Sequence, residues 1–74
     1  MSGLRKRSVL LAGHATSVAL EPEFWAVLDR IAEVRSLSKA QLLANVDAQR
    51  GRRPLASACR LMALDWVAEH GRVS

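Results

Sequence analysis

The segment Thr16-Ser17-Val18-Ala19-Leu20-Glu21-Pro22-Glu23-Phe24-Trp25 determines the fold, because a short strand gives way to a helix within it. Its first five residues alternate between two faces, which is the period of a half-buried strand. One face holds Thr16, Val18 and Leu20, and the other holds Ser17 and Ala19. Pro22 closes the strand and suits the first turn of a helix. We predict a strand over about 14–20 and a helix over about 22–35.

Two further helices follow in the sequence. Ser38 with Gln41 three residues later forms a capping box, which marks the start of a helix over about 38–50. Gly51 is well placed to end that helix, since glycine tolerates the left-handed turn after a helix. Pro54 can open a third helix, over about 54–69, at low cost. The predicted order is therefore one strand followed by three helices.

The third helix carries apolar residues on two sides. One stripe is Leu55, Cys59, Met62 and Trp66, and the other is Leu61, Leu64 and Ala68. A helix that is apolar on two sides must be covered on two sides. In a chain of 74 residues with two other helices, a second copy of the protein is the natural cover.

The residues before the strand allow two arrangements. Residues 1–7 resemble a flexible basic arm, which leaves 8–70 as the folded domain. Gly13-His14 could form the two-residue turn of a hairpin that pairs Ser8–Ala12 with Ala15–Ala19. Otherwise the strand has no partner in its own chain and must pair with a second copy, because unpaired backbone groups are costly when buried.

Charge and composition narrow the classes of function that we expect for the protein. The net charge is +4, and two basic clusters, Arg5-Lys6-Arg7 and Arg50–Arg53, favour an anionic partner. The single cysteine and the two histidines lack the spacing of metal ligands or of a nucleophilic site, so we expect no metal, no cofactor and no enzymatic activity. No stretch is apolar enough to span a membrane. We expect a cytoplasmic protein.

These features together resemble the ribbon-helix-helix superfamily of the Arc and MetJ type. The strand, the segment Glu21–Trp25 and the helix opened by Ser38 carry the resemblance. It is closest to a small bacterial branch with an Ala12-Gly13-His14-like element and a Leu55-x-Ser57-Ala58-x-Arg60-like element in an extra C-terminal helix. The resemblance implies a mainly α-helical fold with one short strand per chain. It also implies an intertwined homodimer with an intermolecular antiparallel ribbon, which lies in the major groove of DNA.

The resemblance also assigns roles to residues. On the ribbon face that meets the bases it places Ala15, Ser17 and Ala19. Against the DNA backbone it places Ser38 and Lys39 at a helix N-terminus, with Arg5, Lys6 and Arg7 in the arm. In the dimer core it places Val18, Leu20, Trp25, Leu28, Leu42, Met62 and Trp66.

The expected function is binding of double-stranded DNA by a homodimeric transcriptional regulator. Relatives commonly carry larger polar side chains on the ribbon face, whereas this chain has alanine at two of its three positions. The alternative is therefore a dimerisation or protein-interaction module, such as an antitoxin-like protein, with weak or lost DNA binding.

Overall fold

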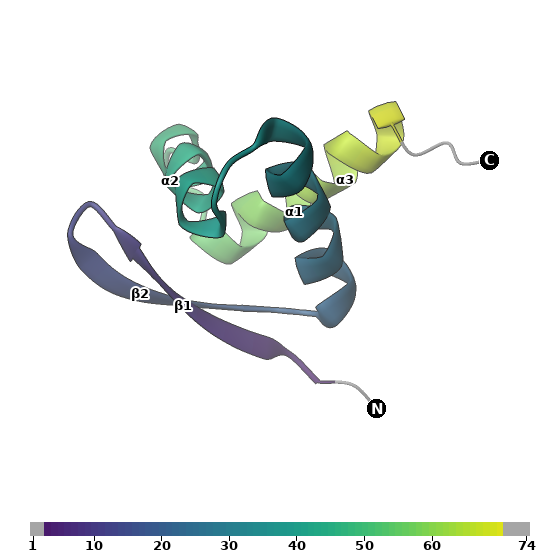
Figure 1. Ribbon diagram of the computed structural model, residues 1–74. Helices are drawn as coiled ribbons and strands as arrows, with labels where there is room; N and C mark the ends of the chain where they lie inside the picture. The colour runs from purple at the N-terminus through teal and green to yellow at the C-terminus, as the bar shows by residue number, and fades with distance from the viewer. Residues whose placement is uncertain (1–2, 71–74) are drawn as a thin grey trace.

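Two strands and three helices make up the fold (Figure 1). The computed structural model describes residues 3–70. In chain order the elements are β1 (Arg5–Leu11), β2 (His14–Leu20), α1 (Pro22–Arg35), α2 (Lys39–Gln49) and α3 (Leu55–His70). The helix α1 has the predicted bounds. The helix α2 begins and ends one residue inside its predicted range, and α3 begins and ends one residue later than predicted.

The two strands form an antiparallel hairpin within one chain. Their register runs from Arg5 opposite Leu20 to Leu11 opposite His14. The turn consists of Ala12 and Gly13, whose φ angles are 52° and 82°. Two consecutive positive φ angles are the signature of the type I′ turn, whose twist matches that of the flanking strands.

This hairpin decides between the two arrangements that the sequence left open, and it corrects two details. The hairpin alternative is confirmed: the chain has two strands rather than the single strand that the resemblance implies, and β2 pairs with β1 of the same chain. The turn lies one residue earlier than the predicted Gly13-His14, because Ala12 adopts the left-handed conformation and His14 pairs with Leu11. The cluster Arg5-Lys6-Arg7 is the start of β1 and not a flexible arm, because these residues pair with Val18, Ala19 and Leu20.

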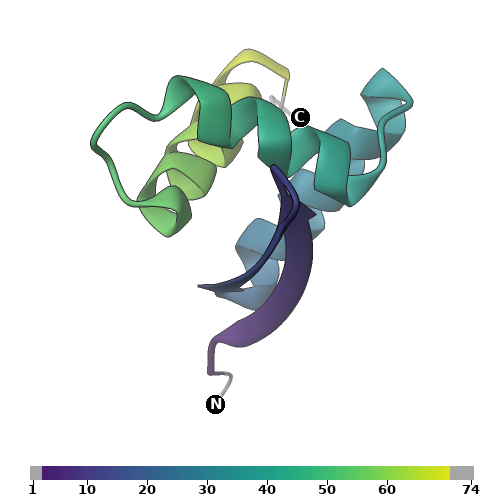
Figure 2. The same ribbon diagram turned by 90° about the vertical axis from the view of Figure 1, so that its left-hand side faces the viewer.

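One face of the hairpin packs against the helices and the other faces away from them (Figure 2). The inner face contributes Val9, Leu11, Val18 and Leu20 to the hydrophobic core. The outer face consists of Lys6, Ser8 and Leu10 from β1 and Ala15, Ser17 and Ala19 from β2. Alternation along each strand produces both sets, because side chains of successive residues point to opposite faces.

The helices form the second layer, above the hairpin (Figure 1). Their fully buried side chains include Leu28, Ile31, Leu42, Leu43 and Cys59. The predicted capping box is present at the start of α2: the Gln41 N–H donates to the Ser38 hydroxyl at 3.0 Å, and the Ser38 N–H donates to the Gln41 side chain at 2.8 Å. The box fixes where α2 starts, directly after the short connection from α1.

The last turn of α1 carries an exposed apolar side chain. Val34, which is three residues after the buried Ile31, is 59% exposed. The buried residues of α1 are Trp25, Leu28, Ile31 and Ala32. Nine residues turn a helix by two and a half revolutions, so Val34 lies on the side opposite Trp25.

The second apolar stripe of α3 is uncovered in the single chain. Leu61 and Leu64 are 40% and 60% exposed, Ala68 is exposed, and the neighbouring Val67 is 40% exposed. The opposite side of α3 packs into the core through Ala58, Cys59 and Ala63. Within residues 3–70, one side of this helix therefore stays exposed, and its cover by a second copy stays a prediction.

The turn at Ala12 offers a test of the hairpin. Ala12→Asn creates Asn-Gly, the dipeptide that type I′ turns favour, and should raise the free energy of unfolding by about 0.5–1 kcal/mol. Urea unfolding followed by circular dichroism measures this change. Ala15→Asn is the matched control, because Asn at an extended strand position should stabilise nothing. If Ala12→Asn is no more stable than the starting protein, the turn is assigned wrongly.

Candidate nucleic-acid interface

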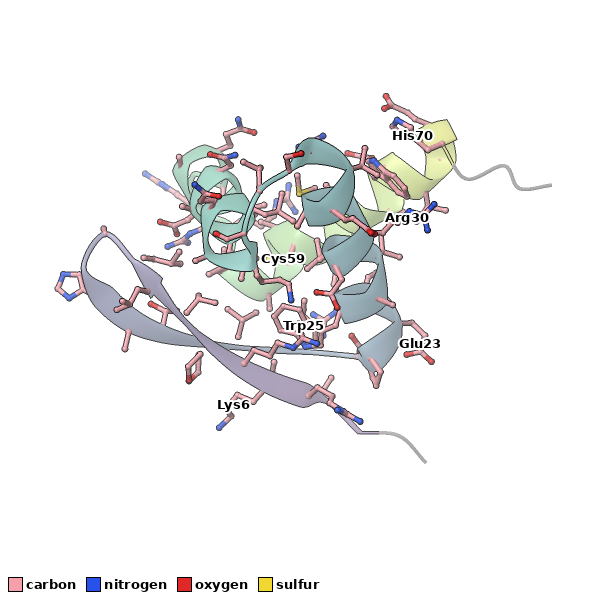
Figure 3. All side chains as sticks on the ribbon, viewed as in Figure 1. Lys6, Glu23, Trp25, Arg30, Cys59 and His70 are labelled. Atoms are coloured by element: carbon pink, nitrogen blue, oxygen red, sulfur yellow. The ribbon has the colours of Figure 1, made fainter. Side chains whose placement is uncertain are left out.

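The outer face of the hairpin is a two-stranded platform of three side-chain pairs. Lys6 lies opposite Ala19, Ser8 opposite Ser17, and Leu10 opposite Ala15. The hydroxyl oxygens of Ser8 and Ser17 are 3.4 Å apart, and either can donate to the other. Leu10 is 66% exposed at the turn end, while Lys6 extends away from the helices at the other end (Figure 3).

The platform contains all three residues that the family resemblance assigned to the ribbon face. Ala15 and Ser17 are exposed and Ala19 is half-buried. Sequence reasoning missed Ser8 and Leu10 and placed Lys6 in an arm, because the pairing of β1 with β2 was left open. The alternation of Lys6, Ser8 and Leu10 with Arg7, Val9 and Leu11 was the signal that could have found them.

Trp25 joins the hairpin to the helices. The side chain is 2% exposed, and its indole N–H donates to the carbonyl oxygen of Arg5 at 2.8 Å. The Arg7 guanidinium carbon lies 4.6 Å from the ring centroid, and the Lys39 ammonium lies 5.7 Å from it. Trp25 therefore connects β1, α1 and the first turn of α2 within one chain (Figure 3).

Asp29 holds the same two cations. Its carboxylate accepts a hydrogen bond from Arg7 at 3.2 Å and forms an ion pair with Lys39. Partial burial raises the pKa of Asp29, but the hydrogen bonds from Lys39 and Arg7 outweigh that effect, so the pKa is below its ordinary value of 3.8. Arg7 and Lys39, both assigned to the DNA backbone by the sequence, are thus brought together by an acidic residue that the sequence did not single out.

The other residues assigned to the DNA backbone are Arg5 and Ser38. Arg5 is exposed at the start of β1. The Ser38 hydroxyl accepts the Gln41 N–H, so it serves as the helix cap. The first turn of α2 carries the positive end of the helix dipole, and it bears Lys39.

A second ion pair fixes the junction between β2 and α1. The Arg60 guanidinium donates to the Glu21 carboxylate at 2.9 Å, and it lies 5.7 Å from the centroid of the Phe24 ring. The hydrogen bond from Arg60 lowers the pKa of Glu21. Arg60 therefore ties α3 to the end of the hairpin, which is a structural role for this part of the α3 signature.

The cluster Arg50–Arg53 lies at the end of α2 and in the loop before α3. The Arg50 side chain donates to Asp47 at 2.6 Å and to the carbonyl oxygen of Arg53 at 2.8 Å. Arg50 and Arg53 line a groove of about 480 Å³, to which α3 contributes Asp65 and Glu69. The charge of this groove is therefore mixed, unlike that of the platform.

The residues assigned to a dimer core lie in the core of a single chain. Val18, Leu20, Trp25, Leu28 and Leu42 are buried, and Met62 and Trp66 are partly buried against them. Trp66 also stacks on His70, with the ring centroids 4.6 Å apart. These residues thus have an intrachain packing role, and the exposed stripe of α3 is separate from them.

Within residues 3–70, no group of histidine, cysteine and acidic side chains could hold a metal ion. In the same range, no helix is both long and apolar enough to cross a bilayer. Cys59 is buried, and desolvation raises the pKa of its thiol to about 11.

Comparison with known proteins agrees with this architecture. A family model described as "Ribbon-helix-helix domain" matches residues 4–67. No curated protein matches the chain, and no solved structure matches it. Domains of this kind typically serve as DNA-binding regulators that form dimers, and they are typically not enzymes.

The ion pairs of Asp29 predict a dependence of stability on pH. A carboxylate whose pKa is lowered by folding contributes stability that is fully present above its unfolded pKa and is lost as pH falls through its folded pKa. The free energy of unfolding should therefore decrease as pH drops below about 3.8. Asp29→Asn should remove part of this decrease, measured by urea unfolding between pH 2 and pH 7 (roughly the range over which carboxylates titrate). An identical pH profile in the variant would contradict the assignment.

Proposed function

Because this chain belongs to the ribbon-helix-helix family, we propose that it binds double-stranded DNA through the outer face of its own hairpin. The observation that carries the proposal is the platform of Lys6, Ser8, Leu10, Ala15, Ser17 and Ala19, which faces away from the core. The major groove of B-DNA is about 12 Å wide and admits a two-stranded ribbon. Here both strands of the ribbon come from one chain.

The side chains of the platform suit contact with base edges. A serine hydroxyl can donate or accept, so Ser8 and Ser17 can each bond to any base. The aliphatic side chains of Leu10, Ala15 and Ala19 can contact thymine methyl groups. Lys6 can donate to guanine or to a phosphate. This set favours binding with modest sequence preference over stringent recognition of one operator.

Phosphate contacts supply the larger part of the affinity. The net charge of +4 attracts DNA, and the basic residues at the start of β1 lie beside the platform. Each phosphate neutralised by a lysine or arginine releases counterions, so affinity falls steeply as salt rises. We propose that the protein acts as a transcriptional regulator in the cytoplasm.

Binding to random duplexes tests the proposal. The affinity of the wild-type protein, measured by fluorescence anisotropy, should fall at least tenfold between about 50 and 200 mM salt. Lys6→Gln should weaken binding to all sequences and reduce the salt slope by about 1. Arg52→Gln is the matched control, because it removes one positive charge from the loop after α2. Equal effects of the two variants would show that net charge, and not the platform, governs binding.

The exposed stripe of α3 supports a second candidate function. With β2 paired to β1, the need for a second copy comes from Leu61, Leu64 and Val67 instead of from an unpaired strand. The alternative is therefore a dimerisation or protein-interaction module, in which this stripe binds a second copy or another protein and DNA binding is weak or absent.

The mass of the protein in solution tests whether the exposed stripe of α3 or the hairpin holds two copies together. Analytical ultracentrifugation at micromolar concentration should give a dimer, and Leu64→Glu should convert it to a monomer with unchanged helical circular dichroism. Leu10→Glu, which alters an equally exposed leucine on the hairpin, should leave the dimer intact and weaken DNA binding. A wild-type monomer would exclude self-association through α3. A dimer that does not bind DNA at low salt would favour the interaction module.

A further inference from the structure

A basic recess lies between the start of β1 and the helix α1, on the other side of the hairpin from the platform. Its volume is about 220 Å³, and it is lined by Arg5, Arg7, Pro22, Trp25, Ala26 and Asp29. Arg5 and Arg7 alternate along β1 with Lys6, so their side chains leave the strand on the opposite face. Contacts between the platform and DNA bases do not involve this recess.

The recess has the chemistry of a site for a phosphate group. A guanidinium presents a rigid fork of N–H donors that matches phosphate oxygens, and two arginine residues line this recess. Arg7 is held in place by the face of the Trp25 ring, whose indole N–H is itself fixed by the Arg5 carbonyl oxygen. A cation that is already positioned loses less side-chain entropy when it binds an anion.

Asp29 is the one acidic residue among the described residues that line the recess, and it binds Arg7, a cation that a phosphate in the recess would also bind. Its carboxylate pairs with Arg7 and also with Lys39, at the first turn of α2. The Arg7 side chain is 39% exposed and the Asp29 side chain is 46% exposed, so an anion from solution can reach the pair. Ion pairs with this exposure are weak enough to exchange partners.

We propose that this recess binds a backbone phosphate of DNA and that Asp29 competes with the phosphate for Arg7 and Lys39. The proposal deepens the DNA-binding function and rests on it. Asp29 limits the affinity for any duplex, because each binding event must break its ion pairs and leave a carboxylate near the incoming phosphate. The two cations become fully available when the duplex lies against the hairpin and a phosphate replaces Asp29.

Neutralising Asp29 tests the competition. Asp29→Asn should tighten binding to random duplexes by about three- to tenfold, which is the scale set by two partly exposed ion pairs. Glu33→Gln is the matched control, because it makes the same change in net charge one helical turn further along α1 at an exposed residue. Both variants are compared at the same ionic strength, and thermal unfolding monitors their stability.

A second set of variants tests whether Asp29 acts through its two partners. In a protein carrying Arg7→Gln and Lys39→Gln, adding Asp29→Asn should bring no more gain than adding Glu33→Gln. A gain of equal size in both backgrounds would overturn the competition. Equal tightening by Asp29→Asn and Glu33→Gln in the otherwise native protein would overturn it as well.

Inorganic phosphate tests whether the recess binds an anion, independently of DNA binding. At constant ionic strength, replacing chloride with phosphate should raise the melting temperature of Asp29→Asn more than that of Glu33→Gln. If no protein binds a duplex at low salt but this difference is present, the recess is an anion site and the proposed function is wrong. If the difference is absent and duplex binding is present without an Asp29 effect, the function stands and the recess proposal is wrong. The absence of both would refute both proposals.

Discussion

The turn at Ala12 and Gly13 is the constraint on which the rest of the structure depends. Two consecutive positive φ angles reverse the chain within two residues and set Leu11 opposite His14. The register that follows puts every second residue of both strands on the outer face. A shift of one residue in either strand would bury Lys6 or Ser17 and expose Val18 or Leu20. The composition of the platform is thus a consequence of the turn.

Trp25 then decides how the hairpin sits on the helices. The indole N–H binds a carbonyl oxygen of β1, and the ring lies beside Arg7 and Lys39. One side chain thereby joins the start of β1 to α1 and to the first turn of α2. Arg60, bound to Glu21, makes the corresponding connection from α3 to the end of β2. These two contacts attach the hairpin to the helices at the start of β1 and at the end of β2.

Ion pairs within the fold reduce the number of basic side chains that have no acidic neighbour. Arg7 and Lys39 share Asp29, Arg50 binds Asp47, and Arg60 binds Glu21. Within residues 3–70, four basic residues are therefore partly neutralised by carboxylates of the same chain. The clusters of basic residues in the sequence do not reveal these ion pairs, because the two members of a pair lie between 3 and 39 positions apart along the chain. In the proposed binding of DNA, the attraction consequently depends on which cations keep an acidic neighbour.

The sequence by itself determined the helices and the faces of β2. Pro22, the capping box of Ser38 and Gln41, and the period of two from Thr16 to Leu20 are local signals, and each acts through neighbouring backbone groups. The ribbon-helix-helix family was recognisable from the same segments. Only the tertiary structure decided the partner of β2, the burial of Trp25 within one chain and the contact of Asp29 with Arg7 and Lys39. An alanine at positive φ is unfavourable on local grounds, so residue preferences did not indicate a turn at Ala12. Contacts between residues far apart in the chain depend on tertiary packing, and no local pattern encodes them.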